Sequence, residues 1–131
     1  MSIDRESAAV SAAVAHVEAW SRHDWEAARD GLADDVTVTA TTTQPFMKDT
    51  DLVGIDAYMD GLREFAAAVV PGSLVVNATL GDRHNALLMV TVTAALGPGG
   101  AAVTLPGARL YRLDEGDKIS AERVVFFTAP S

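Results

Sequence analysis

The feature that most constrains the fold is the order of two hydrophobic periods along the chain. Apolar residues repeat at helical spacing over about residues 5–21, again in a short segment that begins at Trp25, and again over about residues 52–69. About the last sixty residues instead hold β-branched and apolar runs, separated by turn sequences, at about 73–80, 86–96, 101–113 and 118–128. Helices followed by hairpins are typical of an α+β domain, whereas a parallel sheet would need helices between its strands.

A first strand is predicted at 36–43, where valine and threonine alternate. The sequence therefore predicts three N-terminal helices packed on one face of a curved antiparallel sheet. Asp4 is the expected N-cap of the first helix, and the run Asp49-Thr50-Asp51 is expected to cap the third. Because 131 residues is an ordinary length for one domain, we expect a single domain over 1–131.

Charge and composition restrict the partners of this chain. Its net charge is −8 and its ten basic residues are scattered, so we expect no nucleic-acid partner. No apolar run approaches the roughly 20 residues that cross a bilayer, and the N-terminus does not resemble a secretory signal, so we expect no membrane partner and a cytoplasmic location. The chain has no cysteine and its histidine spacing has no metal-site signature, so we expect neither a metal nor a cofactor.

The second face of the predicted sheet indicates an oligomer. If Val90 and Val92 point to the helices, Thr91 and Thr93 lie on the opposite face, because successive strand residues alternate. That face would be moderately apolar and suited to packing of one sheet on another. We therefore expect a homodimer formed through the sheet.

Four short segments resemble a known family in their order and spacing. They are Ala19-Trp20-Ser21-Arg22-His23-Asp24-Trp25, Leu32-Ala33-Asp34-Asp35-Val36, Gly54-Ile55-Asp56-Ala57-Tyr58, and the terminal hairpin Asp117-Lys118-Ile119 with Phe126-Phe127. The chain thereby resembles, over nearly its whole length, the SnoaL-like branch of the nuclear-transport-factor-2-like superfamily, which includes ketosteroid isomerases and polyketide cyclases. The resemblance implies a cone-shaped pocket, lined by apolar groups, that holds a small apolar ligand.

The resemblance also assigns residues to positions of known chemistry. It places Ala40 where ketosteroid isomerases carry their base, so that carboxylate is missing. It places His16 where those enzymes have an oxyanion-stabilising tyrosine, and Arg109 near their second, protonated acid. Polyketide cyclases pair a carboxylate with a histidine, for which Glu122 and His16 are the nearest candidates. The strand Arg109-Leu110-Tyr111 lacks the aspartate of the relay found in limonene-epoxide-hydrolase-type members.

Three residues are the candidate catalytic groups. His16 lies on the helix strip shared with Trp20, and a neutral imidazole there would exchange protons near neutral pH, although a packing role explains it as well. Arg109 and Glu122 lie on consecutive predicted strands. If this pair faces the pocket, Glu122 would act as base and Arg109 as electrophile; if it faces outward, it is a surface salt bridge. A shift of one residue in register decides between the two faces.

The expected pocket also needs apolar and aromatic walls. Tyr58 adds a hydroxyl that requires a partner when buried, and the methionines adapt to ligand shape, although ordinary core packing explains most of these side chains equally well. The residues predicted to bind substrate are Trp20, Tyr58, Met59, Met89, Tyr111 and Phe126.

Three hypotheses of function follow from these residues. The first is a cofactor-free proton-transfer enzyme of isomerase, cyclase or dehydratase type that acts on a small apolar carbonyl compound. The second is a non-catalytic binding protein with the same pocket, which the missing carboxylate at Ala40 favours. The third is a dimeric interaction module whose pocket is filled by its own side chains.

Overall fold

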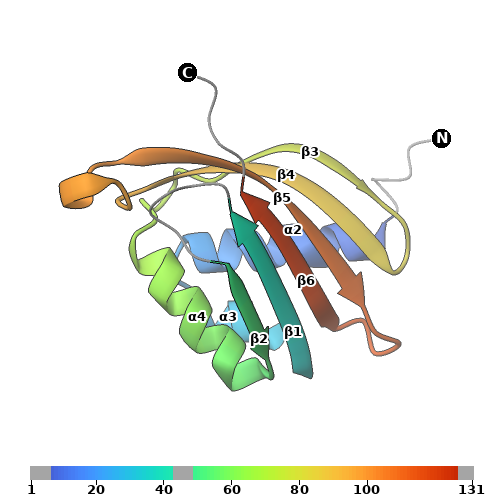
Figure 1. Ribbon diagram of the computed structural model, residues 1–131. Helices are drawn as coiled ribbons and strands as arrows, with labels where there is room; N and C mark the ends of the chain where they lie inside the picture. Colours follow the sequence, from blue (N-terminus) through green and yellow to red (C-terminus); the bar gives the residue numbers. More distant parts are fainter. Residues whose placement is uncertain (1–6, 43–48, 127–131) are drawn as a thin grey trace.

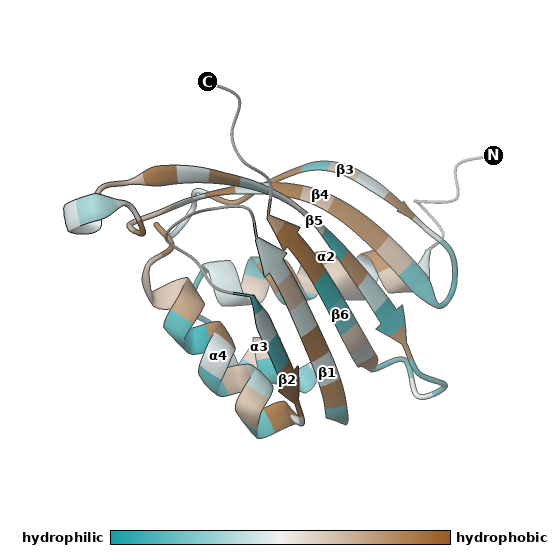
Figure 2. Cartoon of the chain, viewed as in Figure 1, coloured by the Kyte–Doolittle hydropathy of each residue, from teal (hydrophilic) through white to brown (hydrophobic). Residues whose placement is uncertain are grey.

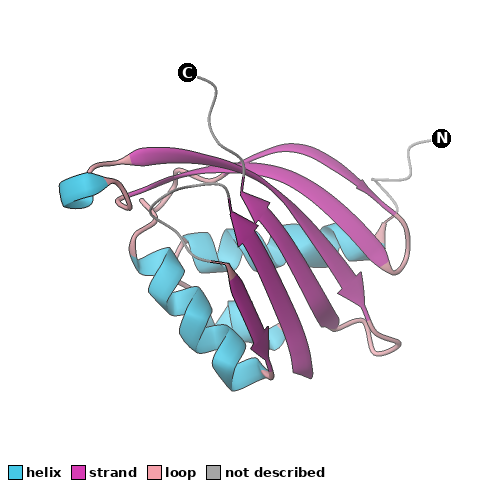
Figure 3. Cartoon of the chain, viewed as in Figure 1, coloured by secondary structure: helices cyan, strands magenta, loops and turns pink. Residues whose placement is uncertain are grey.

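The computed structural model describes residues 7–42 and 49–126, and in this part three α-helices lie on the concave side of a curved six-stranded sheet (Figures 1 and 3). The helices are α2 (Ala8–Ser21), α3 (Trp25–Asp30) and α4 (Ile55–Ala67). The strands are β1 (Leu32–Thr42), β2 (Thr50–Val53), β3 (Val75–Gly81), β4 (Asn85–Ala94), β5 (Val103–Leu113) and β6 (Ile119–Phe126), with a 3₁₀ turn, η1 (Pro98–Gly100), between β4 and β5. The predicted α+β class is confirmed.

The sheet is mixed, which corrects the expectation of a wholly antiparallel one. Its strand order is β2-β1-β6-β5-β4-β3, and β1 runs parallel to β6, with Val38 beside Glu122 and Ala40 beside Val124. The other neighbours are antiparallel. Turn sequences predict local hairpins, but a parallel pair joins strands that are distant in sequence and connected by a long crossover. Local patterns therefore carry no signal for the β1–β6 pair.

The helix starts differ from the predicted caps. Ser7 is the N-cap of α2, where its hydroxyl accepts a hydrogen bond from the backbone of Val10 at 3.0 Å; the predicted cap, Asp4, lies outside the described residues. The segment expected to cap the third helix instead leads into β2, a four-residue edge strand too short to show a clear period. The N-cap of α4 is Gly54, whose φ of 94° favours glycine.

The core lies between the helices and the inner face of the sheet. Along β4 the buried side chains alternate with partly exposed ones, so Val90 and Val92 face the helices, and Thr91 and Thr93 face away, which meets the condition set out above. Burial alternates in the same way along β5 from Leu105 to Leu113, and Figure 2 shows bands of hydrophobic and hydrophilic residues along β5 and β6. A single strand register therefore decides which residues of the sheet face the helices and which face away.

Within residues 7–42 and 49–126, the helices are all too short or too polar to cross a membrane.

Candidate functional site

A cavity of about 580 Å³ lies between α4 and the inner face of β1, β2, β5 and β6. Its walls are mostly apolar, with Val38, Leu52, Leu62, Phe65, Val124 and Phe126 among them. Polar side chains enter from two sides: Tyr58 comes from α4, and Arg109 and Glu122 come from β5 and β6. The cavity therefore combines an apolar wall with a small polar cluster, which is the usual composition of a small-molecule site.

The strand register turns Arg109 and Glu122 to the helix side of the sheet. Tyr111 lies opposite Glu122 and Arg109 lies opposite Val124, so the charged pair is diagonal rather than directly cross-strand. Nη1 of Arg109 donates to Oε2 of Glu122 at 3.3 Å, and the two residues are only 4% and 5% exposed. The pair is thus a buried ion pair, in which removal of either partner would leave a charge in a low-dielectric interior.

Aromatic rings surround the guanidinium of Arg109. Its Cζ atom lies 4.9 Å from the ring centroid of Trp20, 5.7 Å from that of Phe126 and 5.9 Å from that of Phe65. A cation above aromatic faces is attracted by their quadrupoles, and more strongly when water is excluded. Among the described residues the Nε atom of Arg109 has no hydrogen-bond partner. The cation is therefore fixed in place by rings and by Glu122.

Tyr58 joins the carboxylate to a histidine on another helix. Its hydroxyl donates to Oε1 of Glu122 at 2.7 Å and lies 2.9 Å from Nε2 of His16. The other ring nitrogen of His16, Nδ1, lies 3.1 Å from the carbonyl oxygen of Ala28. The resulting chain of short polar contacts runs from α3 through α2 and α4 to β6.

Burial sets the protonation of this chain. It lowers the pKa of His16, although the charge of Glu122 and the hydrogen bond to Ala28 act in the opposite direction. Burial, followed by the charge of Glu122, raises the pKa of Tyr58 well above its ordinary value. His16 is therefore neutral, and Tyr58 keeps its proton near neutral pH.

Tyr111 lies beside the same cluster. Its ring is 5.9 Å from that of His16 in an edge-on arrangement, and burial and the charge of Glu122 raise the pKa of its hydroxyl well above the ordinary value. Although the hydroxyl is near Glu122 and Arg109, it makes no hydrogen bond of acceptable geometry within the described part of the chain. Tyr111 is thus a neighbour of the chain and no link in it.

The structure brings the three candidate catalytic residues into one cluster but gives them unequal access to the cavity. Arg109 and Glu122 line it, whereas His16 is buried behind Tyr58 and outside the lining. Among the described residues no group of three histidine or carboxylate side chains is placed to hold a metal ion.

Of the residues predicted to bind substrate, Tyr58 and Phe126 line the cavity. Trp20, Met59 and Tyr111 are buried beside it without lining it.

Met89 requires a correction, because it lies on the sheet face turned away from the helices and the cavity. Its neighbours Leu88 and Val90 are the buried residues of β4, and side chains alternate along a strand. Phe65 was missed as a wall residue and as a contact of Arg109. Its position seven residues after Tyr58 on one helical stripe was the available signal.

Ala40 lines the cavity from β1 and has Val124 beside it on β6. The buried carboxylate of this cavity comes instead from Glu122, which is paired with Val38 two residues earlier on β1. A base in this site would therefore act from β6 and not from β1.

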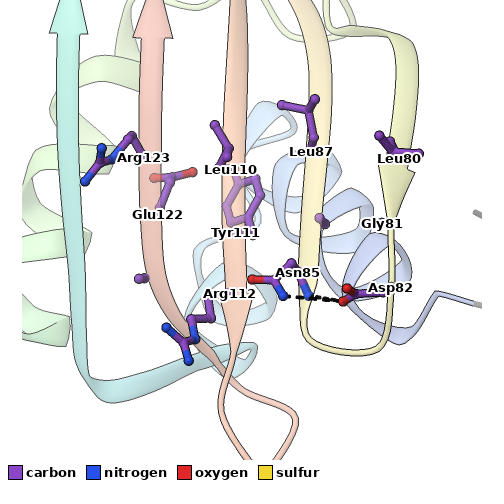
Figure 4. Close-up of a pocket in the computed structure, with 12 residues that line it drawn as sticks. Leu80, Gly81, Asp82, Asn85, Leu87, Leu110, Tyr111, Arg112, Glu122 and Arg123 are labelled. Carbon is purple, nitrogen blue, oxygen red and sulfur yellow. Dashed lines mark hydrogen bonds between the residues drawn. The ribbon is translucent and has the colours of Figure 1, made fainter.

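On the other face of the sheet, a second hollow of about 580 Å³ extends over β3–β6. Figure 4 shows Leu80, Leu87, Leu110 and Arg123 in a row across these four strands, with the helices behind the sheet. Leu80 is 58% and Leu110 46% exposed. This hollow is an apolar surface on the face of the sheet opposite the cavity, although Tyr111 and Glu122 are among the residues that line it.

The chain is similar to one protein family and to several solved structures. A family model described as SnoaL-like domain matches residues 13–122. No match is found among proteins of curated function.

Solved structures share the fold over most of their length. A protein from Kribbella flavida is 24% identical with a TM-score of 0.73, covering 91% of this chain and 86% of that one. A Mycobacterium tuberculosis protein in complex with estradiol-17β-hemisuccinate is 18% identical with a TM-score of 0.74, covering 90% and 92%. A Delta 5-3-ketosteroid isomerase from Mycobacterium sp. is 20% identical with a TM-score of 0.72, also covering 90% and 92%. At these identities the similarity is one of fold.

Proposed function

The chain belongs to the SnoaL-like domain family, and from this premise we propose that it is an enzyme that transfers protons in a small apolar carbonyl compound. The reaction would be of isomerase, cyclase or dehydratase type and would need no cofactor. The observation that carries the proposal is one carboxylate, Glu122, buried in a largely apolar cavity and held by Tyr58 and Arg109. Buried carboxylates with fixed partners are typical of acid–base sites.

The two charged residues have complementary roles in this reaction. Glu122 removes a proton from the carbon next to the carbonyl group, and the electron pair of the broken C–H bond moves to the carbonyl oxygen. Arg109 stabilises the negative charge that develops on that oxygen, because its guanidinium is already fixed and desolvated beside the base. Glu122 then returns the proton to another carbon or to a leaving group.

The size and the walls of the cavity support a small ligand. A volume of about 580 Å³ falls within the range of about 300–1,000 Å³ found for ligand pockets. The apolar walls favour a hydrophobic compound, and the cluster of Tyr58, Arg109 and Glu122 favours one polar group on it. An open cavity also speaks against the hypothesis of a pocket filled by its own side chains.

Ala40 favours a second candidate function, a binding protein without catalysis. This residue lines the cavity at the position where the resemblance expects a carboxylate base. If Glu122 serves only to neutralise Arg109, the cavity would bind a ligand and leave it unchanged.

Hydrogen exchange distinguishes the two functions. Enolisable ketones, from small cyclic ketones to 3-ketosteroids, are incubated with the protein in D₂O, and loss of the signal of the hydrogen next to the carbonyl is followed by proton NMR. We expect exchange with the wild type and a decrease of roughly 100-fold or more in Glu122→Gln, the usual size of a general-base contribution. Glu18→Gln, an exposed carboxylate outside the cavity, is the matched control and should exchange like the wild type. Ligand binding without exchange would establish the binding protein instead.

We further propose that the chain forms a homodimer through the outer face of its sheet. The row of Leu80, Leu87 and Leu110, together with Met89 on the next row, makes this face apolar over adjacent strands. Exposed contiguous apolar surface of this kind is typical of protein–protein contacts.

A further inference from the structure

The Tyr58 hydroxyl occupies an unusual position between two groups that both accept hydrogen bonds. Oε1 of Glu122 lies 2.7 Å from it and Nε2 of His16 lies 2.9 Å from it. A hydroxyl has one proton, so it can donate to only one of these atoms at a time. The proton content of the two neighbours therefore decides which way the hydroxyl points.

The tautomer of His16 follows from its other nitrogen. The carbonyl oxygen of Ala28 can only accept a hydrogen bond, so Nδ1 of His16, 3.1 Å away, must carry a proton. Because burial lowers the pKa of His16, the ring is neutral and Nε2 presents a lone pair. Nε2 is thus an acceptor that faces the oxygen of Tyr58.

The cluster is therefore short of one proton while Glu122 is ionised. The Tyr58 proton points to Oε1 of Glu122, so a lone pair of the Tyr58 oxygen faces the lone pair on Nε2 of His16 without a proton between them. One added proton on Oε1 of Glu122 removes this conflict. The protonated carboxyl group then donates to the Tyr58 oxygen, and the Tyr58 proton turns to Nε2 of His16.

We propose that Tyr58 is a hydrogen-bond switch, which donates to Glu122 while that carboxyl group is ionised and to His16 once it has taken a proton. The inference rests on the proposed function in treating Glu122 as the base. In the reaction, the C–H bond of the substrate breaks and an O–H bond forms on Oε1 of Glu122. Tyr58 only rotates its own proton, so His16 stays neutral and acts as a positioning residue that never touches the substrate.

The other groups that face this cluster keep their places during the switch. Arg109, from β5, donates to Oε2 of Glu122 and not to the oxygen that faces Tyr58. Tyr111, from the same strand, makes no hydrogen bond to the chain of Tyr58 and His16 within the described residues. The carbonyl oxygen of Ala28, from α3, holds Nδ1 of His16 in both states. Rotation of one hydroxyl is therefore sufficient.

Glu122→Gln is a stable mimic of the protonated state. Arg109 requires an acceptor, so the amide oxygen of Gln takes the position of Oε2 and the NH₂ group takes the position that faces Tyr58. That NH₂ group donates to the Tyr58 oxygen as the protonated carboxyl group would. The variant should therefore turn the Tyr58 proton to His16 permanently.

The switch is tested by nitrogen-15 NMR of the histidine rings in the ligand-free protein near neutral pH. With three histidines in the chain, His16 is assigned by comparison with His16→Gln. In the wild type we expect Nε2 of His16 to resonate as an unprotonated nitrogen that accepts no hydrogen bond. In Glu122→Gln its resonance should move to that of a hydrogen-bonded acceptor and show a scalar coupling to the Tyr58 hydroxyl proton. Identical Nε2 signals in the two proteins, or a proton on Nε2 of the wild type, would overturn the proposal.

Two further variants separate the switch from the loss of charge. In a Tyr58→Phe background the change Glu122→Gln removes the same charge without a hydroxyl, so the Nε2 response should be lost. In a Tyr111→Phe background, where a buried hydroxyl outside the chain is removed, the response should persist. If Tyr58→Phe does not fold, the coupling seen in Glu122→Gln alone remains decisive. Absence of hydrogen exchange in the ketones would contradict the proposed function. The nitrogen-15 spectra are recorded without ligand, so they would still test the switch.

Discussion

At the scale of single residues, the buried pair of Arg109 and Glu122 dominates the stability of the site. Arg109→Met keeps an aliphatic stem among the aromatic rings but leaves Glu122 without its cation. Breaking a buried pair from one side usually costs about 3–5 kcal/mol, because the remaining charge is uncompensated. We therefore expect the free energy of unfolding, measured by urea denaturation near neutral pH, to fall by about that amount.

The exposed pair of Arg29 and Asp56 provides the matched control for this prediction. These side chains are 2.9 Å apart but 48% and 87% exposed, so Arg29→Met should cost at most about 1 kcal/mol. The double variant with Arg109→Met and Glu122→Gln should lose less stability than the sum of the two single changes, because it leaves no unpaired charge. Equal losses in the variants of Arg109 and Arg29 would show that burial adds nothing to the pair.

At the scale of elements, Gly81 fixes how closely the hairpin of β3 and β4 approaches the start of α2. A Cβ atom at this position would lie 2.6 Å from the carbonyl oxygen of Asn85 and 2.7 Å from Cγ2 of Val10. Because one of these atoms belongs to the backbone, the clash cannot be relieved by side-chain rotation alone. Gly81→Ala should lower the free energy of unfolding by about 1–3 kcal/mol, as overpacking usually does.

Gly31 is the matched control for this effect. A Cβ atom there would meet nothing within 4 Å, and its φ of −82° suits any residue. Gly31→Ala should therefore be neutral or stabilise the protein by roughly 0.4–1 kcal/mol through the unfolded chain. If the urea midpoints of the two alanine variants coincide, close packing between the hairpin and α2 is not what requires glycine at position 81.

At the scale of the whole molecule, the proposed homodimer would form through the outer face of the sheet. Leu110 is 46% exposed at the β5 end of the apolar row, beside Arg123, where a charge would oppose packing of one sheet on another without disturbing the inner core. We expect a dimer for the wild type and a monomer for Leu110→Asp in sedimentation equilibrium. Val53→Asp places the same charge on the edge strand β2, at a side chain 72% exposed, and should leave the dimer intact. A monomeric wild type would contradict the proposal.

The sequence predicts the helices and strands better than it predicts which of them contact one another. Helical and strand periods are local, so the three helices and the last four strands appear close to their predicted positions. The strand β2 was missed because its four residues are too few to display a period. The pairing of β1 with β6 was missed because no turn joins those strands.

The sequence by itself determined the α+β class and the helical stripe that contains Tyr58, and it named His16, Arg109 and Glu122 as candidates while leaving their burial open. Only the tertiary structure decided that His16, Tyr58 and Glu122 meet, since these contacts span 42 and 64 residues of chain. It also decided that Arg109 faces the cavity and Met89 faces away. The physical reason is strand register: a shift of one residue exchanges the faces of a sheet, while the local composition that sequence patterns detect stays the same.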